Sequence, residues 1–89
     1  MITEKDRKTI LDTARKYRAT RVLLFGSTLS DSIESRDIDI AVDGVADKDF
    51  FAFYAELLCK LSKPVDIIDL SKKTKFVELV LKEGLSLYA

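Results

Sequence analysis

The sequence has 89 residues, of which 47% are apolar, and its fifteen basic residues balance its fifteen acidic residues. This length and composition predict one small domain that forms a core. The balanced charge excludes the net basic surface of a general nucleic-acid-binding protein. The chain has no histidine and a single cysteine, Cys59. A histidine general base, a histidine-containing zinc site and an internal disulfide are therefore excluded, which leaves carboxylates, hydroxyls, lysines or a bound metal for any catalysis.

The sequence shows no sign of a membrane span or of an export signal. No apolar run approaches the roughly 20 residues that cross a bilayer. The N-terminal residues MITEKDRKTI lack the apolar core of a signal peptide. We therefore predict a cytoplasmic protein without membrane contact.

Helix and strand signals alternate along the chain. Apolar residues recur at helical spacing in some segments and form continuous or alternating runs in others. In chain order, we predict a helix over 4–18, a strand over 21–25, a loop or short helical turn over 28–36, a strand over 37–42, a helix from 47 to before the proline at 64, a strand over 65–70, a helix up to 84, and an extended tail over 85–88. The expected N-caps are Thr3, Asp47 and either Ser71 or Thr74, and Gly84 is the expected C′ residue of the last helix.

The order of these elements predicts an α/β fold with a small mixed sheet, in the order α-β-β-α-β-α. The strand–helix–strand unit over 37–70 favours parallel pairing of the second and third strands. The short connection between the first and second strands permits them to run antiparallel. We expect this antiparallel pairing because it brings the end of the first strand beside the start of the second.

Two aspartates on alternate positions of the second predicted strand are candidate metal ligands. Asp37 and Asp39 point to the same face, with Cβ atoms about 6–7 Å apart. Aspartate is a poor strand former, and two such charges repel unless water or a cation screens them. A solvated strand face that carries two acids explains this pair equally well.

Asp66 favours the metal-site interpretation. It opens the third predicted strand, so parallel pairing places it next to Asp37 and Asp39. Three carboxylates are hard oxygen ligands, which suit Mg²⁺ or Mn²⁺ far better than zinc. Two such ions about 3.5–4 Å apart form the usual clamp for phosphoryl or nucleotidyl transfer.

Gly26 and Ser27 end the first predicted strand and are candidates for phosphate binding. Glycine lets the backbone approach a phosphate closely, and the N–H groups that follow form an anion nest. The Ser27 hydroxyl adds a hydrogen bond to a phosphate oxygen. An ordinary turn is the simpler explanation of a lone Gly-Ser pair, so this interpretation depends on its position beside the acids.

Three blocks of sequence together resemble the minimal nucleotidyltransferases of the DNA polymerase β-like superfamily. They are LLFGS at 23–27, RDIDIAV at 36–42 and PVDIIDL at 64–70. The resemblance covers roughly residues 20–88 and implies a single nucleotidyltransferase domain over 1–89.

The resemblance also implies a role for each candidate residue. Gly26 and Ser27 would bind a nucleoside triphosphate. Asp37 and Asp39 would ligate two Mg²⁺ ions, with Mn²⁺ as an alternative, and Asp66 would ligate the catalytic ion and help to deprotonate the attacking hydroxyl. The chain departs from the family pattern at two points.

The spacer between Ser27 and Asp37 has nine residues instead of the usual ten. In addition, Thr28 follows the Gly-Ser pair, where many members have an arginine. These departures leave open whether a phosphate-contacting or partner-contacting cation is present in this chain.

The reaction of this family transfers a nucleoside monophosphate, often AMP from ATP, to a hydroxyl and releases pyrophosphate. Many small members are antitoxins encoded with a HEPN-domain toxin, and some modify a tyrosine of that toxin. The resemblance therefore implies ATP or another nucleoside triphosphate as substrate and a HEPN-domain protein as partner. The small size implies that the acceptor site is shared with a partner or with a second subunit of a homo-oligomer.

Two other functions stay open. The first is a catalytically inactive binding module that neutralises its partner by contact. The second is a transferase for a small molecule such as an aminoglycoside, although those enzymes usually have an added domain.

Three further features have predicted structural roles. Asp69 is expected to cap or turn the chain before the last helix, and Cys59 is expected to be a small buried residue. The aromatic residues Phe50, Phe51, Phe53 and Tyr54 exceed one helical stripe. Most of these rings are predicted to lie in the core, with one or two exposed at a protein interface.

Overall fold

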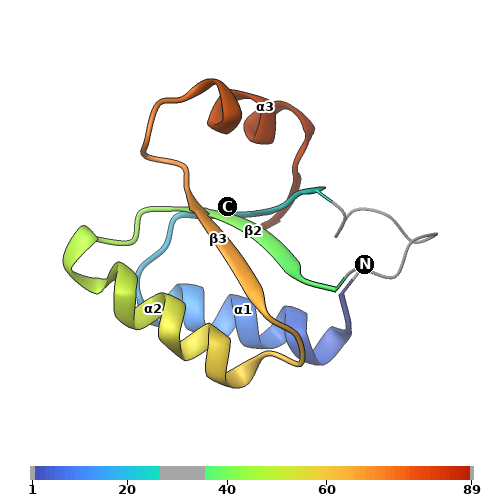
Figure 1. Cartoon of the computed structure of the whole chain (residues 1–89). Helices are drawn as coiled ribbons and strands as arrows, with labels where there is room; N and C mark the ends of the chain where they lie inside the picture. Colours follow the sequence, from blue (N-terminus) through green and yellow to red (C-terminus); the bar gives the residue numbers. More distant parts are fainter. Residues whose placement is uncertain (1, 27–35, 89) are drawn as a thin grey trace.

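A mixed β-sheet runs through the middle of the molecule, with helices on both sides (Figure 1). The computed structural model describes residues 2–26 and 36–88. Within them, the elements are α1 (Glu4–Lys16), β1 (Arg21–Leu24), β2 (Ile38–Asp43), α2 (Asp47–Lys60), β3 (Val65–Asp69), α3 (Lys75–Glu83) and β4 (Leu85–Tyr88). The strand order in the sheet is β3-β2-β1-β4.

Both predicted strand pairings are confirmed. β2 pairs with β1 in antiparallel orientation and with β3 in parallel orientation. Residues 85–88, which were expected only as an extended tail, form β4 and pair antiparallel with β1. The pairing of β4 shifts register between Val22 and Leu23. Because β4 covers the outer side of β1, the edges of this sheet are β3 and β4.

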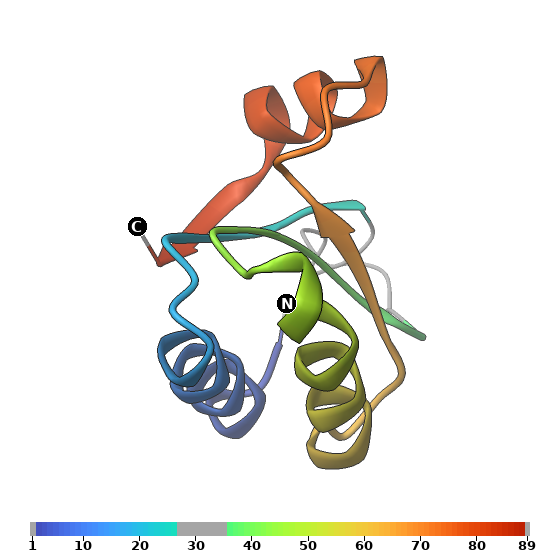
Figure 2. The ribbon, with the colours of Figure 1, turned by 90° about the vertical axis from the view of Figure 1, so that its left-hand side faces the viewer.

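Two layers of helices enclose the sheet. Figure 2 shows α1 and α2 side by side on one face and α3 on the other. The larger buried cluster lies on the α1–α2 face and includes Ile10, Val22, Leu24, Ile38, Ile40, Val42, Phe53, Leu57, Val65 and Ile67. The smaller cluster lies under α3 and consists of Leu23, Ala41, Leu70, Val77 and Val80. Alternate residues of β1 and β2 thus enter opposite clusters, as the period of a strand requires.

Two of the predicted N-caps are confirmed. The Thr3 side chain accepts a hydrogen bond from the Asp6 backbone N–H, and the Thr74 side chain accepts one from Val77. The prediction for Asp47 is wrong, because Ala46 is the N-cap of α2 and makes no side-chain cap bond. Asp47 is the first helical residue, and its carboxylate lies 4.0 Å from the Lys72 ammonium.

The predicted ends of two helices are also corrected. α1 stops at Lys16 because Tyr17 is its C-cap and Arg18 takes a left-handed φ of 62°. Gly84 does follow α3, but it is an extended C-cap with φ of −68° and ψ of 153°. The chain must pass straight from α3 into β4, which a left-handed turn would prevent. Glycine is needed there for space, since a Cβ would lie 2.7 Å from the Val80 carbonyl oxygen.

The outer surface of α2 exposes Cys59, which was expected to be buried, and Phe51, one of the aromatic rings of which one or two were expected to be exposed. Phe53 and Leu57 face the core, whereas Cys59 and Phe51 are exposed. Each exposed residue is two positions from a buried one, which is a rotation of about 200° around a helix. The prediction that Cys59 is buried is therefore wrong. No helix in the described parts of the chain is long and apolar enough to cross a bilayer.

A buried carboxylate joins α1 to the loop between α2 and β3. Asp6 is only 3% exposed. Its carboxylate accepts hydrogen bonds from the Ser62 backbone N–H at 3.1 Å and from the Ser62 hydroxyl. The side chain thus fixes the start of α1 against the turn that leads into β3.

We expect Asp6→Ala to lower the free energy of unfolding by about 1–3 kcal/mol, because the two hydrogen bonds between the buried carboxylate and Ser62 are lost. Urea denaturation measures this change. Asp12→Ala is the matched control, since Asp12 lies on the same helix and its ion pairs with Lys8 and Arg15 are exposed, so that they contribute at most about 1 kcal/mol. Equal losses for the two variants would contradict the structural role of Asp6.

Candidate active site

The parallel pairing of β2 and β3 sets two acidic residues side by side. Asp39 and Asp66 are register partners across these strands. Neighbouring strands lie about 4.8 Å apart, and register partners point to the same face of the sheet. Asp37 precedes β2 by one residue and is exposed. The structure therefore brings the carboxylates of Asp39 and Asp66 to one place, with Asp37 next along the chain.

The charges of Asp66 and Asp37 act on the Asp39 carboxylate. The pKa of Asp39 is raised above its ordinary value, first by partial burial and then by the negative charges of Asp66 and Asp37. A raised pKa means that the ionised form of Asp39 is disfavoured at this position. A cation bound there would lower the pKa of Asp39 again, since an opposite charge favours the ionised carboxylate.

These acids lie on the same sheet face as α3. Asp39 is two positions before Ala41, which is buried under α3, and Asp66 is two positions before Ile68, which packs against the same cluster. Neither Asp39 nor Asp66 is buried. α1 and α2 occupy the opposite face (Figure 1). A ligand can thus approach the acids from the α3 side without displacing the main core.

The backbone of Gly26 lies directly against the Asp39 carboxylate. A Cβ placed on Gly26 would be 2.7 Å from Asp39 Oδ2. The φ of Gly26 is +65°, a left-handed conformation that favours glycine. This places the end of β1 beside the acids, as the sequence predicted. Residues 27–35 lie outside the described part of the chain. They include Ser27 and most of the loop or turn expected at 28–36. The role of Ser27 in phosphate binding therefore stays a prediction.

The donor atoms suit a hard divalent cation, but the carboxylates do not form a closed ligand shell. Among residues 2–26 and 36–88, no three His, Cys, Asp or Glu side chains are grouped closely enough to hold a metal ion. Mutual repulsion of the charges opposes such a grouping in the protein alone. The roles of Asp37, Asp39 and Asp66 as ligands of Mg²⁺ or Mn²⁺ stay predictions.

Tyr54 of α2 contacts the acidic site and was not identified from the sequence. Its hydroxyl lies 3.4 Å from Asp66 Oδ1 and 3.1 Å from the Val65 carbonyl oxygen, and it accepts a bond from the Ile67 N–H at 3.4 Å. Burial is the main cause that raises the pKa of Tyr54, and the charge of Asp66 adds to it. The phenol therefore keeps its single proton, for which the Val65 carbonyl oxygen and Asp66 Oδ1 are the two acceptors within reach. A tyrosine among phenylalanines was the available signal, since a half-buried hydroxyl needs a partner.

Asp69 has the predicted turn role. Its Oδ1 accepts hydrogen bonds from the Ser71 N–H at 2.9 Å and from the Ser71 hydroxyl at 2.7 Å. The carboxylate therefore closes the turn between β3 and α3 and is separate from the three-acid group.

The family described as "Polymerase beta, Nucleotidyltransferase" matches residues 8–89. The comparison with curated proteins returns no match.

Solved structures of toxin–antitoxin complexes contain chains of the same fold. A toxin–antitoxin with AMP-PNP aligns with a TM-score of 0.77 at 23% identity, over 93% of this chain and 73% of that chain. The MntA-HepT toxin–antitoxin aligns with a TM-score of 0.74 at 22% identity, over 98% and 73%. A tri-AMPylated HEPN toxin from Shewanella oneidensis in complex with an MNT antitoxin gives 0.72 at 23% identity, over 94% and 70%. These likenesses confirm the predicted fold.

We expect Asp39→Asn to raise the free energy of unfolding at neutral pH without added metal. The change removes a charge whose ionised form is disfavoured in the folded state. The gain is at most about 1 kcal/mol, because solvent screens these charges. Because the folded-state pKa of Asp39 is raised, the gain is present above that pKa and shrinks as the pH falls through it. Chemical denaturation of both proteins over a range of pH measures it, and a loss of stability at neutral pH would contradict the repulsion.

We expect Gly26→Ala to destabilise the fold by about 1–2 kcal/mol for the left-handed φ, with a further cost for the clash with Asp39. Adding Asp39→Ala to Gly26→Ala removes the clash but leaves the cost of the left-handed φ. The effects of these two substitutions on the free energy of unfolding should therefore differ from additivity by at least about 0.5 kcal/mol. Gly44→Ala is the control, because Gly44 also has a positive φ but crowds Thr20. The effects of Gly44→Ala and Asp39→Ala on the free energy of unfolding should add. If the effects of Gly26→Ala and Asp39→Ala also add, Gly26 does not abut Asp39.

Proposed function

We propose a function that follows from the family of this chain: it belongs to the polymerase beta nucleotidyltransferases. The proposed reaction is the Mg²⁺-dependent transfer of AMP from ATP to a hydroxyl, with release of pyrophosphate. The observation that carries this proposal is the Gly26 backbone against the Asp39 carboxylate, with Asp66 in register beside it. That arrangement supports the proposal, because a glycine bend that would bind phosphate lies next to acids that would bind a cation.

The acids and the glycine bend have different roles in the proposed reaction. Asp37, Asp39 and Asp66 would hold the divalent ions, which when bound supply Lewis-acid stabilisation of the charge on the phosphoryl oxygens. Gly26 and Ser27 would hold the phosphates. This division matches catalysis by positioning and electrostatics, with little covalent work for the protein.

Asp66 is suited to receive the proton of the attacking hydroxyl. It is exposed and lies on the edge strand β3, where an acceptor approaches from solvent. The acceptor oxygen would bond to the α-phosphorus while the bond to pyrophosphate breaks, and its proton would pass to Asp66. Tyr54 would act as a positioning residue, because its hydroxyl contacts Asp66 Oδ1.

The proposed acceptor is a hydroxyl of a HEPN-domain toxin, and the proposed role is that of its antitoxin. Chains of this fold occur in the MntA-HepT complex and in the complex with a tri-AMPylated HEPN toxin. Within the described residues, Asp37 and Asp66 are exposed and Asp39 is partly exposed, so the side chain of a partner protein could reach them.

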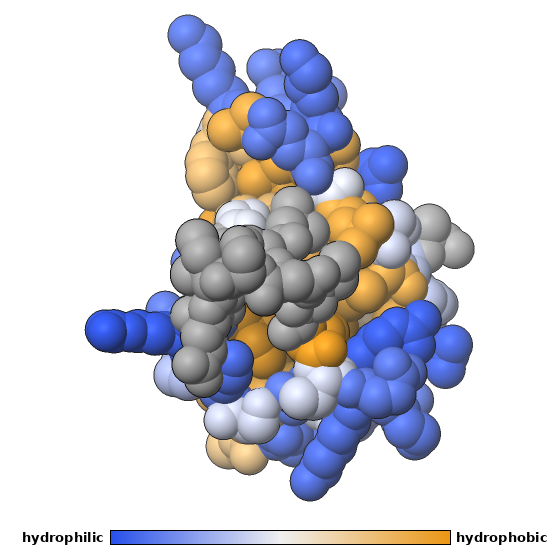
Figure 3. Space-filling view, turned by 90° about the vertical axis from the view of Figure 1, so that its right-hand side faces the viewer, coloured by the Kyte–Doolittle hydropathy of each residue, from blue (hydrophilic) through white to orange (hydrophobic). Residues whose placement is uncertain are grey.

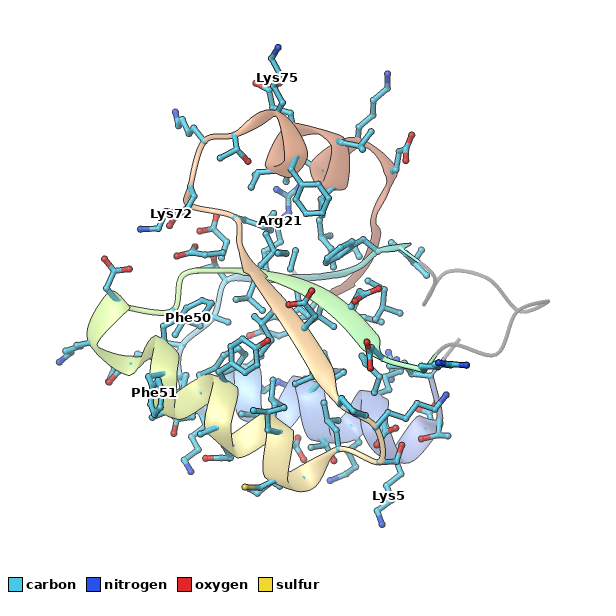
Figure 4. The ribbon with its side chains drawn as sticks, viewed as in Figure 1. Lys5, Arg21, Phe50, Phe51, Lys72 and Lys75 are labelled. Atoms are coloured by element: carbon cyan, nitrogen blue, oxygen red, sulfur yellow. The ribbon has the colours of Figure 1, made fainter. Side chains whose placement is uncertain are left out.

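A second candidate function is neutralisation of that partner by contact alone. It is favoured by the exposed apolar surface of α2, where Phe51 is 85% and Leu58 is 50% exposed. Phe50 and Phe51 both project from this helix (Figure 4). A hollow of about 540 Å³ on this helix is lined by Asp47, Phe50, Phe51, Tyr54, Ala55 and Leu58. Contact through this surface would need no metal site.

The double variant Asp37→Asn/Asp39→Asn separates the two functions. We expect it to reduce AMP transfer to a co-purified HEPN partner below detection, because both proposed ions lose ligands. Mass spectrometry of the partner measures the transfer, and circular dichroism verifies the fold. Asp43→Asn is the matched control, since Asp43 lies at the far end of the same strand.

Transfer that persists in the double variant would refute the proposed reaction. Neutralisation of the partner that persists without transfer would instead favour the binding module.

A further inference from the structure

Tyr54 presents a hydroxyl of the protein itself at the proposed proton acceptor of the reaction. Its oxygen lies 3.4 Å from Asp66 Oδ1, and Asp66 is the residue proposed above to receive the proton of the attacking hydroxyl. We propose that Tyr54 is itself an acceptor, so that the chain transfers AMP from ATP to its own Tyr54 hydroxyl. This inference rests on the function proposed above and adds a second substrate, which is a side chain of the same protein.

The chemical step is the one proposed for an acceptor on a partner. The Tyr54 oxygen would form a bond to the α-phosphorus of ATP, while the bond from that phosphorus to the oxygen of the leaving pyrophosphate breaks. The phenol proton would pass to the Asp66 carboxylate. A phenol with its ordinary pKa of about 10 is protonated at neutral pH, so the attack needs a base within reach of the hydroxyl. Hydrogen bonds to a catalytic base are often long before the substrate binds, and the contact of 3.4 Å is of this kind.

Backbone groups of β3 hold the Tyr54 hydroxyl in this place. It lies 3.1 Å from the Val65 carbonyl oxygen and accepts a hydrogen bond from the Ile67 N–H at 3.4 Å. Acceptor and base are therefore already together before ATP binds. Holding two reacting groups in place lowers the entropic cost of bringing them together. A hydroxyl from another protein would have to meet that cost on each encounter.

A hollow on α2 gives the attached AMP a place to lie. Tyr54 lines this hollow together with Asp47, Phe50, Phe51, Ala55 and Leu58. Its volume of about 540 Å³ falls within the about 300–1,000 Å³ that is usual for small-molecule pockets. The Phe51 ring is 85% exposed, and an exposed aromatic ring offers a base a surface on which to stack. Charged side chains cover much of another side of the molecule (Figure 3), whereas Asp47 is the one charged residue among the described lining of the hollow.

The two other tyrosines of the chain have their described contacts elsewhere. The Tyr17 hydroxyl donates to Glu56 Oε1 at 3.3 Å. Tyr88 ends β4, which forms the opposite edge of the described sheet from β3, and its ring lies against the Arg15 guanidinium. Self-transfer is therefore expected at Tyr54 and not at these two residues.

Mass spectrometry of the full chain, incubated with ATP and Mg²⁺ in the absence of a partner, tests the proposal. We expect the wild-type protein to gain the mass of AMP, and fragmentation of its peptides to locate the AMP on Tyr54. Tyr54→Phe keeps the ring but removes the attacking oxygen, so the gain should be lost. Tyr88→Phe is the matched control and should be modified like the wild-type protein. Circular dichroism verifies the fold of both variants, and the location of AMP in the wild-type protein is independent of either variant.

A second incubation, with the co-purified partner present, separates this proposal from the proposed function. AMP on the partner with none on Tyr54 in either incubation would overturn self-transfer and leave the proposed function intact. AMP that is found on another residue of the chain, and that persists in Tyr54→Phe, would overturn Tyr54 as the acceptor. AMP on neither protein would overturn both proposals.

Discussion

The parallel pairing of β2 with β3 sets Asp39 and Asp66 side by side, and the rest of the candidate site lies around this pair. Two carboxylates side by side on a partly buried sheet face lower the stability of the protein on its own. The raised pKa of Asp39 reflects this loss of stability. Burial is its largest cause, and the charges of Asp66 and Asp37 follow. Strained or repulsive groups persist where the surrounding structure over-determines them, and such places are often functional. In this chain, the large core on the opposite sheet face holds the strands in place regardless of the acids.

The division of the sheet into two unequal faces explains how one small chain combines stability with an accessible site. α1 and α2 bury most of the core, including Phe53 and Leu57, against one face. Among the described residues, α3 packs on the other face, which also carries Asp39, Asp66 and Gly26. Tyr54 links the two sides, because it belongs to a core-packing helix and reaches Asp66 around the edge strand.

The sequence was sufficient to predict the pairings, because the spacing of the strand–helix–strand unit leaves few alternatives. It also identified Thr3, Thr74 and Asp69, whose hydrogen bonds reach residues only two or three positions away. It was insufficient for Cys59 and Gly84. The exposure of Cys59 depends on the rotation of α2 against the sheet, and the conformation of Gly84 depends on where the chain must go next. Tyr54 and β4 depend on contacts distant in sequence, which local patterns do not encode.

The central claim is that Asp39 and Asp66 share a divalent cation beside Gly26. A crystal structure of the protein with Mg²⁺ and AMP-PNP tests it most directly. The account predicts an ion with carboxylate oxygens of both residues at about 2.0–2.1 Å, and triphosphate oxygens next to the Gly26 backbone. An ordered nucleotide bound elsewhere, or an Asp66 carboxylate that keeps its contact with the Tyr54 hydroxyl while the ions lie away from Asp39, would contradict it.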